Sequence, residues 1–162
     1  MTNQYDDIIK QAVNRWWRGL DWLWIKAQIM QESTFNPLAV SSCGAKGLMQ
    51  LMPSVIEQFR VTDAFDPEQN VEAGVRRLSA AWVQFKREDG IERMKFAFAG
   101  YNCGEGHIFD AQDAAEAGKR DSRIWDNVSP FLRQFTGNDN ARQTINYVSR
   151  ILDFYHQLAK EG

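Results

Sequence analysis

Apolar residues recur at helical spacing along nearly the whole chain. One stripe marks the segment from residue 66 to residue 90, and another marks the C-terminal segment. Apolar positions three and four residues apart lie on one face of an α-helix, whereas the strict alternation typical of strands is scarce in this sequence. The two stripes consist of Val71, Val75, Leu78, Trp82 and Phe85, and of Thr144, Tyr147, Val148, Ile151, Leu152, Tyr155 and Leu158. The pattern predicts an all-α fold.

Capping and helix-breaking residues predict where the helices begin and end. Asp21 is a candidate N-cap, Pro53 suits the first turn of a short helix, and Gly90 is expected to end the helix that opens at Asp66. The small, Gly-rich segment 41–47 is expected to be a loop, 119–122 a polar loop, and 136–140 a turn. The expected helices span residues 5–16, 21–32, 53–59, 66–90, 91–102, 107–117, 125–135 and the C-terminal segment around 144–158.

Length and composition predict a single domain that covers residues 1–162. The chain has 162 residues, of which 44% are hydrophobic, and this is enough for one ordinary core. No internal repeat, low-complexity tract or linker interrupts it. Because residues 96–99 are all apolar, we expect the helix over 91–102 to be fully buried.

Charge and residue content exclude several classes of function. A net charge of -2 and a pI near 5.7 give no basic surface for nucleic acid. No apolar run is long enough to predict a membrane span. His107 and His156 are the only histidines and have no companions at metal-ligand spacing, so we expect neither a metal site nor a cofactor. Cys43 and Cys103 are too few for a disulfide scaffold and are expected to be free thiols.

Glu32 is the carboxylate with the most informative position. It follows the apolar residues Ile29 and Met30 at the end of a predicted helix, just before the Asn36-Pro37 turn. A carboxyl group among apolar side chains has a raised pKa because its charged form is disfavoured. A general acid that works near neutral pH needs such a pKa. A lone Glu at a helix end is more often a solvated surface group, so this position alone does not assign a function.

Four short blocks in a fixed order change the interpretation of Glu32. They read Gln31-Glu32-Ser33, Gly47-Leu48-Met49-Gln50, Gly100-Tyr101-Asn102 and Gln143-Thr144-Ile145-Asn146-Tyr147. In this order they resemble the soluble lytic transglycosylase-like superfamily, which shares the goose-type lysozyme fold. The segments 65–71, 101–111 and 125–128 are most similar to the catalytic domain of the membrane-bound lytic murein transglycosylase F subfamily. The resemblance implies a single lysozyme-like helical domain with a substrate cleft.

The resemblance implies cleavage of the MurNAc-β-1,4-GlcNAc bond of peptidoglycan without water. Most glycosidases use two carboxylates, but the four blocks contain only Glu32, and Asp110 and Asp113 are expected to be solvated charges. In this family the acetamido group of the substrate is thought to act as the second group. One Glu serves as acid and then as base, and the product carries a 1,6-anhydro end. Two alternatives stay open: a hydrolytic goose-type lysozyme, and a non-catalytic peptidoglycan-binding or assembly module.

Polar residues of the blocks are assigned supporting roles by their matching positions. Ser33 is expected to hydrogen-bond Glu32 or the acetamido group, or alternatively to cap the helix end. Gln50 and Asn102 carry both donors and acceptors for sugar amides, although an Asn at a helix end is also a common cap. Tyr101 is expected to offer a phenol or a ring to Glu32 or to the sugar.

Two of the remaining predicted site residues could either contact the substrate or belong to the core. Tyr147 either faces the substrate or belongs to the core, and Met49 either forms a wall of the sugar site or fills the core. Gly47 is expected to permit a backbone turn that brings Met49 and Gln50 to the cleft. Leu48 and Gln143 complete the predicted set, and Gln143 stands where many relatives have Glu.

The biological setting of the chain is left open by its sequence. The N-terminal residues MTNQYDDIIK show no signal peptide. A cell-wall enzyme acting in the periplasm or outside the cell then requires another route, as a phage protein, a secretion-associated enzyme or a domain excised from a longer protein. The expected partner is the glycan strand, which this acidic chain must hold by shape and hydrogen bonds, and no protein partner is indicated.

Overall fold

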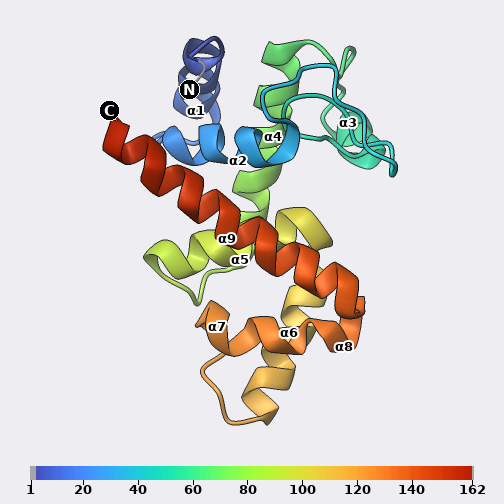
Figure 1. Cartoon of the computed structure of the whole chain (residues 1–162), viewed down its shortest axis with the longest axis vertical. Coiled ribbons are helices and arrows are strands. Elements are labelled where there is room, and N and C mark those ends of the chain that lie inside the picture. Colours follow the sequence, from blue (N-terminus) through green and yellow to red (C-terminus); the bar gives the residue numbers. More distant parts are fainter. Residues whose placement is uncertain (1–2, 162) are drawn as a thin grey trace. The chain divides into compact units, whose positions relative to one another are not determined.

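Helices make up the regular structure of residues 3–161, which are the residues that the computed structural model describes (Figure 1). Their bounds are α1 (Asp6–Trp16), α2 (Leu23–Ser33), α3 (Pro53–Gln58), α4 (Pro67–Gln84), α5 (Gly90–Cys103), α6 (Glu105–Ala117), α7 (Trp125–Val128), the 3-10 helix η1 (Ser129–Phe131), α8 (Arg133–Thr136) and α9 (Asn138–Glu161). Two isolated β-bridges, both at Lys46, are the only strand-like pairing within this range. The all-α prediction is confirmed. Met1, Thr2 and Gly162, which the single-domain prediction includes, lie outside the described residues.

The N-terminal helices lie close to where the sequence predicts them. Pro53 is the first residue of α3, as expected. α2 begins at Leu23 rather than at Asp21. The Asp21 carboxylate nevertheless accepts a hydrogen bond from the Leu23 N–H at 3.0 Å, so it still satisfies one of the open donors of the helix start.

The prediction that Gly90 ends a helix is wrong. α4 ends at Gln84, and Gly90, with a φ of +50°, is the first residue of α5. The Nε atom of Arg93 on α5 donates to the Trp82 carbonyl oxygen near the end of α4 at 3.0 Å. Such a bond satisfies a carbonyl group that a helix end leaves open. A side chain of the next helix therefore caps α4, where the sequence suggested a glycine cap.

Two further expectations about helices need correction. The single helix over 125–135 is divided into α7, η1 and α8, because Pro130 lacks the N–H that a continuous helix requires and lies in the first turn of η1. The turn over 136–140 is shorter than expected, since Gly137 (φ +81°) alone separates α8 from α9. In α5, residues 96–100 are buried as predicted, but Ile91 is 42% exposed, so the helix is not buried over its whole length.

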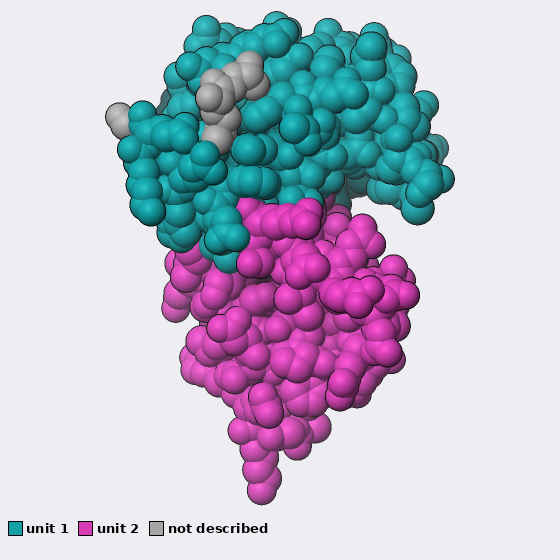
Figure 2. Space-filling view, in the orientation of Figure 1, with its two compact units in different colours: residues 1–77, 151–162 teal, residues 78–150 magenta. Residues whose placement is uncertain are grey.

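The chain divides into two compact units (Figure 2). Unit 1 comprises residues 1–77 and 151–162, and unit 2 comprises residues 78–150. The Glu32 block and the 47–50 block belong to unit 1, whereas the 100–102 block and the 143–147 block belong to unit 2.

The helix that carries Glu32 is buried on nearly all sides within unit 1. Residues 24–29 of α2 are all buried, which is typical of a helix in the middle of a core. The Trp24 ring stacks on Tyr155 with centroids 3.6 Å apart, and the Tyr155 hydroxyl donates to the Asp21 carboxylate at 2.9 Å. These contacts fix the start of α2.

A buried ion pair also anchors α2 to α1. Lys26 is only 3% exposed, and its Nζ atom lies 2.7 Å from Oδ1 of Asp6 and donates to Oδ1 of Asn3 at 3.0 Å. Removing one partner of such a pair leaves an uncompensated buried charge, which is strongly destabilising. The position of α2 is therefore set by specific polar contacts as well as by apolar packing.

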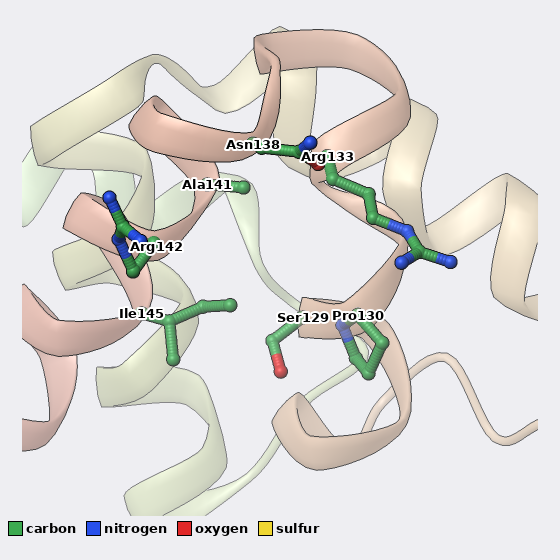
Figure 3. Close-up of a pocket in the computed structure, with 7 residues that line it drawn as sticks. All are labelled: Ser129, Pro130, Arg133, Asn138, Ala141, Arg142 and Ile145. Carbon is green, nitrogen blue, oxygen red and sulfur yellow. The ribbon is translucent and has the colours of Figure 1, made fainter.

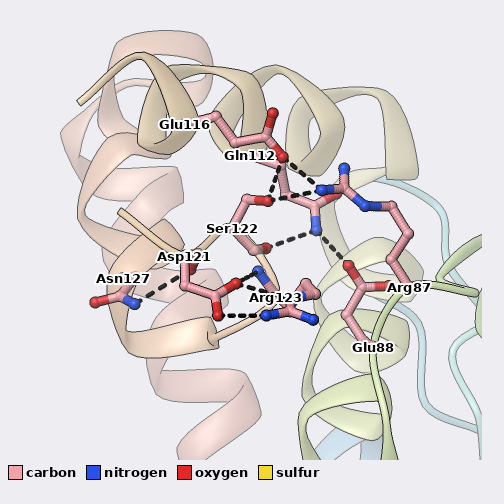
Figure 4. A network of polar contacts seen from close by, with 8 residues as sticks. All are labelled: Arg87, Glu88, Gln112, Glu116, Asp121, Ser122, Arg123 and Asn127. Carbon is pink, nitrogen blue, oxygen red and sulfur yellow. Dashed lines mark hydrogen bonds and ion pairs between the residues drawn. The ribbon is translucent and has the colours of Figure 1, made fainter. Parts of the chain in front are cut away.

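A polar network fixes the connection between α6 and α7 in unit 2 (Figure 4). Glu116 on α6 accepts hydrogen bonds from the Ser122 hydroxyl at 2.6 Å and from Arg87 at 2.7 Å. Gln112 on α6 donates to the Ser122 carbonyl oxygen at 2.9 Å and to the buried Glu88 carboxylate at 2.7 Å. The polar loop predicted at 119–122 is thus tied to α6 and to the connection between α4 and α5.

Candidate active site

Glu32 lies in the last turn of α2 and is half-buried. The helix ends directly after it because Thr34 and Phe35 have left-handed backbone angles, with φ of +52° and +62°. The Thr34 N–H still donates to the Met30 carbonyl oxygen at 3.2 Å and closes the last turn. Left-handed angles are costly for residues other than glycine and concentrate at functional sites. The chain therefore accepts strained backbone in order to turn immediately beyond Glu32.

Ser33 joins the first block to the second. Its hydroxyl donates to the Leu48 carbonyl oxygen at 2.8 Å and lies 3.3 Å from the Ile29 carbonyl oxygen. The partners of this hydroxyl are thus main-chain carbonyl groups, one of them in the loop that contains the second block. In this structure Ser33 holds the end of α2 against Leu48, which is itself buried.

Asn70 on α4 holds the second block in place. Its side chain is 0% exposed, and its Oδ1 atom accepts a hydrogen bond from the Met49 N–H at 2.8 Å. Its Nδ2 atom donates to the carbonyl oxygens of Lys46 at 2.9 Å and Ala64 at 2.8 Å. One buried amide therefore satisfies three main-chain groups of two different loops. Asn70 was not among the predicted site residues, although it lies in the 65–71 segment that carries part of the resemblance.

Gly47 is required by the close approach of Asn70. Its φ is +78°, which favours glycine, and a Cβ atom there would overlap the Asn70 amide nitrogen and the Ala64 carbonyl oxygen. The Gln50 N–H donates to the Gly47 carbonyl oxygen at 3.2 Å and closes a turn. The predicted backbone turn at Gly47 is confirmed, and its role in bringing Met49 and Gln50 to the cleft stays a prediction.

Met49 and Gln50 point to different surroundings. Met49 is 0% exposed and packs against Gly74, where a Cβ atom would overlap its sulfur. Gln50 is half-buried, and its Nε2 atom donates to the carbonyl oxygens of Ala39 at 3.2 Å and Gly47 at 3.0 Å. Because both amide hydrogens of Gln50 bind the loop itself, the carbonyl oxygen is what this side chain has to offer a ligand.

Asn102 and Thr144 connect the third block to the fourth within unit 2. The Thr144 hydroxyl lies 2.8 Å from the Asn102 Oδ1 atom, to which it donates, and 3.1 Å from the Asn140 carbonyl oxygen. Thr144 is buried, whereas the neighbouring Gln143 is exposed. The residue of the fourth block that contacts Asn102 is thus Thr144, which the sequence analysis quoted but did not select.

The other predicted residues of unit 2 differ in burial. Tyr101 is half-buried on α5, and Tyr147 is buried on α9, as the alternative of a core residue requires. Cys103 is half-buried, and burial raises the pKa of its thiol. Cys43 is exposed, and both cysteines are free, as predicted.

Neither a metal-binding cluster nor a membrane-spanning helix is found among the described residues. Among residues 3–161, no three His, Cys, Asp or Glu side chains gather in a group that could hold a metal ion. Within the same range, no helix is both long and apolar enough to cross a membrane. Unit 1 therefore contains a carboxyl group at a constrained helix end and a Gln50 amide held by its own loop. Unit 2 contains an Asn102 amide oriented by Thr144.

A sequence model of the transglycosylase SLT domain family matches residues 9–124, which is most of the chain. This chain belongs to that family. The matched range contains the first three blocks, and therefore Glu32, Gln50 and Asn102.

Curated relatives of this SLT domain carry the name membrane-bound lytic murein transglycosylase F. The relative from Desulfosudis oleivorans is 38% identical over 98% of this chain, and the one from Maricaulis maris is 32% identical over 87%. The chain spans only 37% and 33% of the length of these two relatives. The similarity agrees with the subfamily that the sequence resembles.

Solved structures confirm the fold. The 70 kDa soluble lytic transglycosylase in complex with bulgecin A has a TM-score of 0.73 and 25% identity, over 98% of this chain and 25% of that one. An inactive glutamate-to-glutamine mutant of a lytic transglycosylase from Pseudomonas aeruginosa has a TM-score of 0.69 and 26% identity, over 97% and 24%. The Escherichia coli enzyme alone, at 24% identity and a TM-score of 0.67, shows the same fold.

Proposed function

We propose that this SLT domain cleaves the MurNAc-β-1,4-GlcNAc bond of peptidoglycan as a lytic transglycosylase, with Glu32 as its acid and base. The observation that carries the proposal is the half-buried Glu32 at a strained helix end that Ser33 holds against the Leu48 carbonyl group. The names of the relatives support the reaction class. The solved relative that is inactive carries glutamine in place of a glutamate, which supports a glutamate as the essential group.

One carboxyl group can serve both halves of such a reaction. Protonated Glu32 donates its proton to the glycosidic oxygen as that oxygen leaves with the GlcNAc sugar. The acetamido carbonyl of MurNAc stabilises the positive charge at the anomeric carbon. The Glu32 carboxylate then takes the proton of the MurNAc 6-hydroxyl, whose oxygen bonds to the anomeric carbon and closes the 1,6-anhydro ring. No water is consumed, and the attacking group is already tethered, which gives it an entropic advantage.

We assign hydrogen bonds to the amide groups of the sugars to two polar side chains, Gln50 and Asn102, which are themselves held by hydrogen bonds. The Gln50 carbonyl oxygen is suited to accept a sugar amide N–H, because the amide hydrogens of Gln50 bind the loop. The Asn102 amide hydrogens are suited to donate to a sugar carbonyl, because its oxygen accepts from Thr144. The contacts of Tyr101 and Tyr147 with the substrate stay predictions.

A matched pair of variants tests the role of Glu32. Glu32→Gln keeps the shape of the side chain but removes its proton chemistry, so release of soluble fragments from purified peptidoglycan should fall by at least about a hundredfold. Glu57→Gln makes the same change on the exposed face of α3 and should leave the rate unchanged. Binding to intact peptidoglycan, measured by sedimentation, should be the same for both variants.

Three results would contradict the proposal in different ways. Equal rates for Glu32→Gln and the parent chain would remove Glu32 from the reaction. Binding without release of fragments by the parent chain would indicate a non-catalytic module. Fragments that end in reducing MurNAc, identified by mass spectrometry, would indicate the hydrolytic muramidase alternative.

A further inference from the structure

Arg76 on α4 contacts two aromatic rings of unit 1. Its guanidinium carbon lies 4.4 Å from the centroid of the Trp16 ring and 4.3 Å from the centroid of the Phe59 ring. Trp16 is the last residue of α1 and Phe59 follows α3, so these contacts join three helices of the same unit. Aromatic faces attract a cation, and contact with two of them restricts the movement of the guanidinium. We call Trp16, Phe59 and Arg76 the Arg76 cluster.

The guanidinium of Arg76 has no acidic partner in the described part of the chain. Glu72 lies four residues before it on the same helix, which is the spacing at which a Glu–Arg pair is expected. The Glu72 carboxylate instead accepts a hydrogen bond from Arg15 at 2.8 Å. No ion pair or side-chain hydrogen bond among residues 3–161 includes the half-buried Arg76. Because a guanidinium has five N–H donors, the edge of this one is open to an external acceptor.

The Arg76 cluster lies on the side of α4 that faces away from the second block. Asn70 and Gly74 are one turn apart on α4, and both contact Met49 of that block. Glu72 and Arg76 come two residues after them, and two residues turn an α-helix by about 200°. They therefore point to the opposite side of the helix. A ligand bound to Arg76 is thus separate from the loop assigned to the candidate active site.

The charges and the ring surface of the cluster define the kind of ligand. Arg15 and Glu72 neutralise each other, so Arg76 adds one positive charge, which a single carboxylate matches. A phosphate monoester carries about 1.5 to 2 negative charges at pH 7 and would stay partly unpaired. Trp16 is 40% exposed, and a large exposed ring offers an apolar surface to the C–H groups of a sugar. A net charge of -2 disfavours a nucleic acid strand.

We propose that the Arg76 cluster binds a carboxylate-bearing saccharide, with the carboxylate on Arg76 and the sugar ring on Trp16. The planar fork of a guanidinium matches both oxygens of a carboxylate. Binding at this site includes no bond cleavage. The site would hold an acidic sugar of a cell-wall polymer while Glu32 acts on another part of it, and only this role rests on the proposed function.

Binding is tested by NMR on the full chain. The probes are methyl β-D-glucuronide, the uncharged methyl β-D-glucoside, acetate, and adenosine monophosphate as an anion that carries a base. The indole N–H signal of Trp16, identified by its loss in Trp16→Phe, is followed during each titration. We expect the glucuronide to shift this signal and to bind at least about tenfold more tightly than the glucoside or acetate, because it alone offers both a carboxylate and a sugar ring.

A second place with arginine side chains supplies the matched control. Figure 3 shows a pocket of about 330 Å³ in unit 2, which is lined in part by the exposed Arg133 and Arg142. Arg142 is paired with Asp139 at 2.9 Å. Arg133→Met removes one positive charge beside this pocket and should leave binding of the glucuronide unchanged.

Variants of Arg76 measure what its guanidinium contributes. Arg76→Met keeps an unbranched side chain against the two rings but removes the charge, so the glucuronide should bind at least about tenfold more weakly. Arg76→Lys keeps the charge and removes the planar fork, so the loss should be about threefold. Thermal melts show whether each chain remains folded, and Arg76→Lys decides the question if Arg76→Met does not fold.

Four results would overturn the inference. These are an unshifted Trp16 signal, equal affinity for the glucuronide and either the glucoside or acetate, tighter binding of adenosine monophosphate than of the glucuronide, and equal losses in the Arg76 and Arg133 variants. Such a failure in a chain that still cleaves peptidoglycan rejects only the saccharide site. Glucuronide binding in a chain that cleaves nothing rejects the proposed function and keeps the site.

Discussion

In unit 1 the predicted site residues of the second block lie on a loop, whereas in unit 2 the predicted site residues lie on two regular helices. The loop at residues 47–50 contains left-handed backbone at Gly47 and Gln50 and depends on the buried amide of Asn70. In unit 2, α5 and α9 carry Asn102 and Thr144, and one side-chain hydrogen bond joins them. The comparison teaches that the loop is shaped by a few long-range contacts, whereas the backbone of each helix is held by hydrogen bonds within that helix.

Removing the Asn70 amide should have the largest effect on stability. Asn70→Ala leaves the Met49 N–H and the carbonyl groups of Lys46 and Ala64 without their partner, and each unsatisfied buried group is costly. We expect the free energy of unfolding, measured by urea denaturation, to fall by about 4 kcal/mol. Asn146→Ala, on the exposed face of α9, should change it by less than about 0.5 kcal/mol. Similar losses in the two variants would show that the loop does not depend on Asn70.

A methyl group at Gly47 should have the next largest effect. Gly47→Ala introduces both an unfavourable φ and an overlap with Asn70 and Ala64, and we expect a loss of about 3 kcal/mol. Gly19→Ala separates the two causes, because Gly19 has a φ of +94° but no atom within 4 Å of the added Cβ. Its loss should be about 1 kcal/mol. If the free energy of unfolding falls by the same amount in both glycine variants, the overlap with Asn70 and Ala64 does not contribute to the loss at Gly47.

Changing the contact in unit 2 should have the smallest effect on folding but a visible effect on activity. Thr144→Val keeps the shape of the side chain and removes the hydroxyl that binds Asn102, so stability should fall by only about 1 kcal/mol. Cleavage of peptidoglycan should fall several-fold through a raised KM, because the Asn102 amide is no longer oriented. Thr144→Ser restores the hydroxyl and should recover the activity. A Thr144→Val chain with the parent KM would show that this hydroxyl does not position Asn102.

Local features of the chain were predictable from its sequence, and distant contacts were not. Helical periodicity and Pro53 predicted the all-α class and the start of α3, because these signals act within one or two turns. Gly90 was misinterpreted because α4 is capped by the side chain of Arg93 on the next helix, a contact that leaves no signal at the end of α4 itself. Asn70 was missed for the same reason, since the loop that needs its amide lies more than 20 residues away along the chain.

The four blocks were enough to indicate the family from the sequence, but the contacts of the individual residues in them became clear only from the structure. Ser33 was predicted either to contact Glu32 or the acetamido group or to cap the helix end, and its hydroxyl lies near the Ile29 carbonyl group of that helix end and binds the Leu48 carbonyl group in the next block. In the fourth block, Gln143 was selected because relatives often have Glu there, whereas the buried Thr144 makes the contact to Asn102. Spacing in the sequence places such residues near one another but does not show which polar groups meet.

Digestion of purified peptidoglycan in water enriched in oxygen-18 tests most directly whether the MurNAc 6-hydroxyl, and not water, attacks the anomeric carbon. Mass spectrometry of the fragments released by the parent chain should show anhydro ends that contain no heavy oxygen, and the Glu32→Gln chain should release almost none of them. One heavy oxygen at each new MurNAc end would show that water is the nucleophile and would contradict this account.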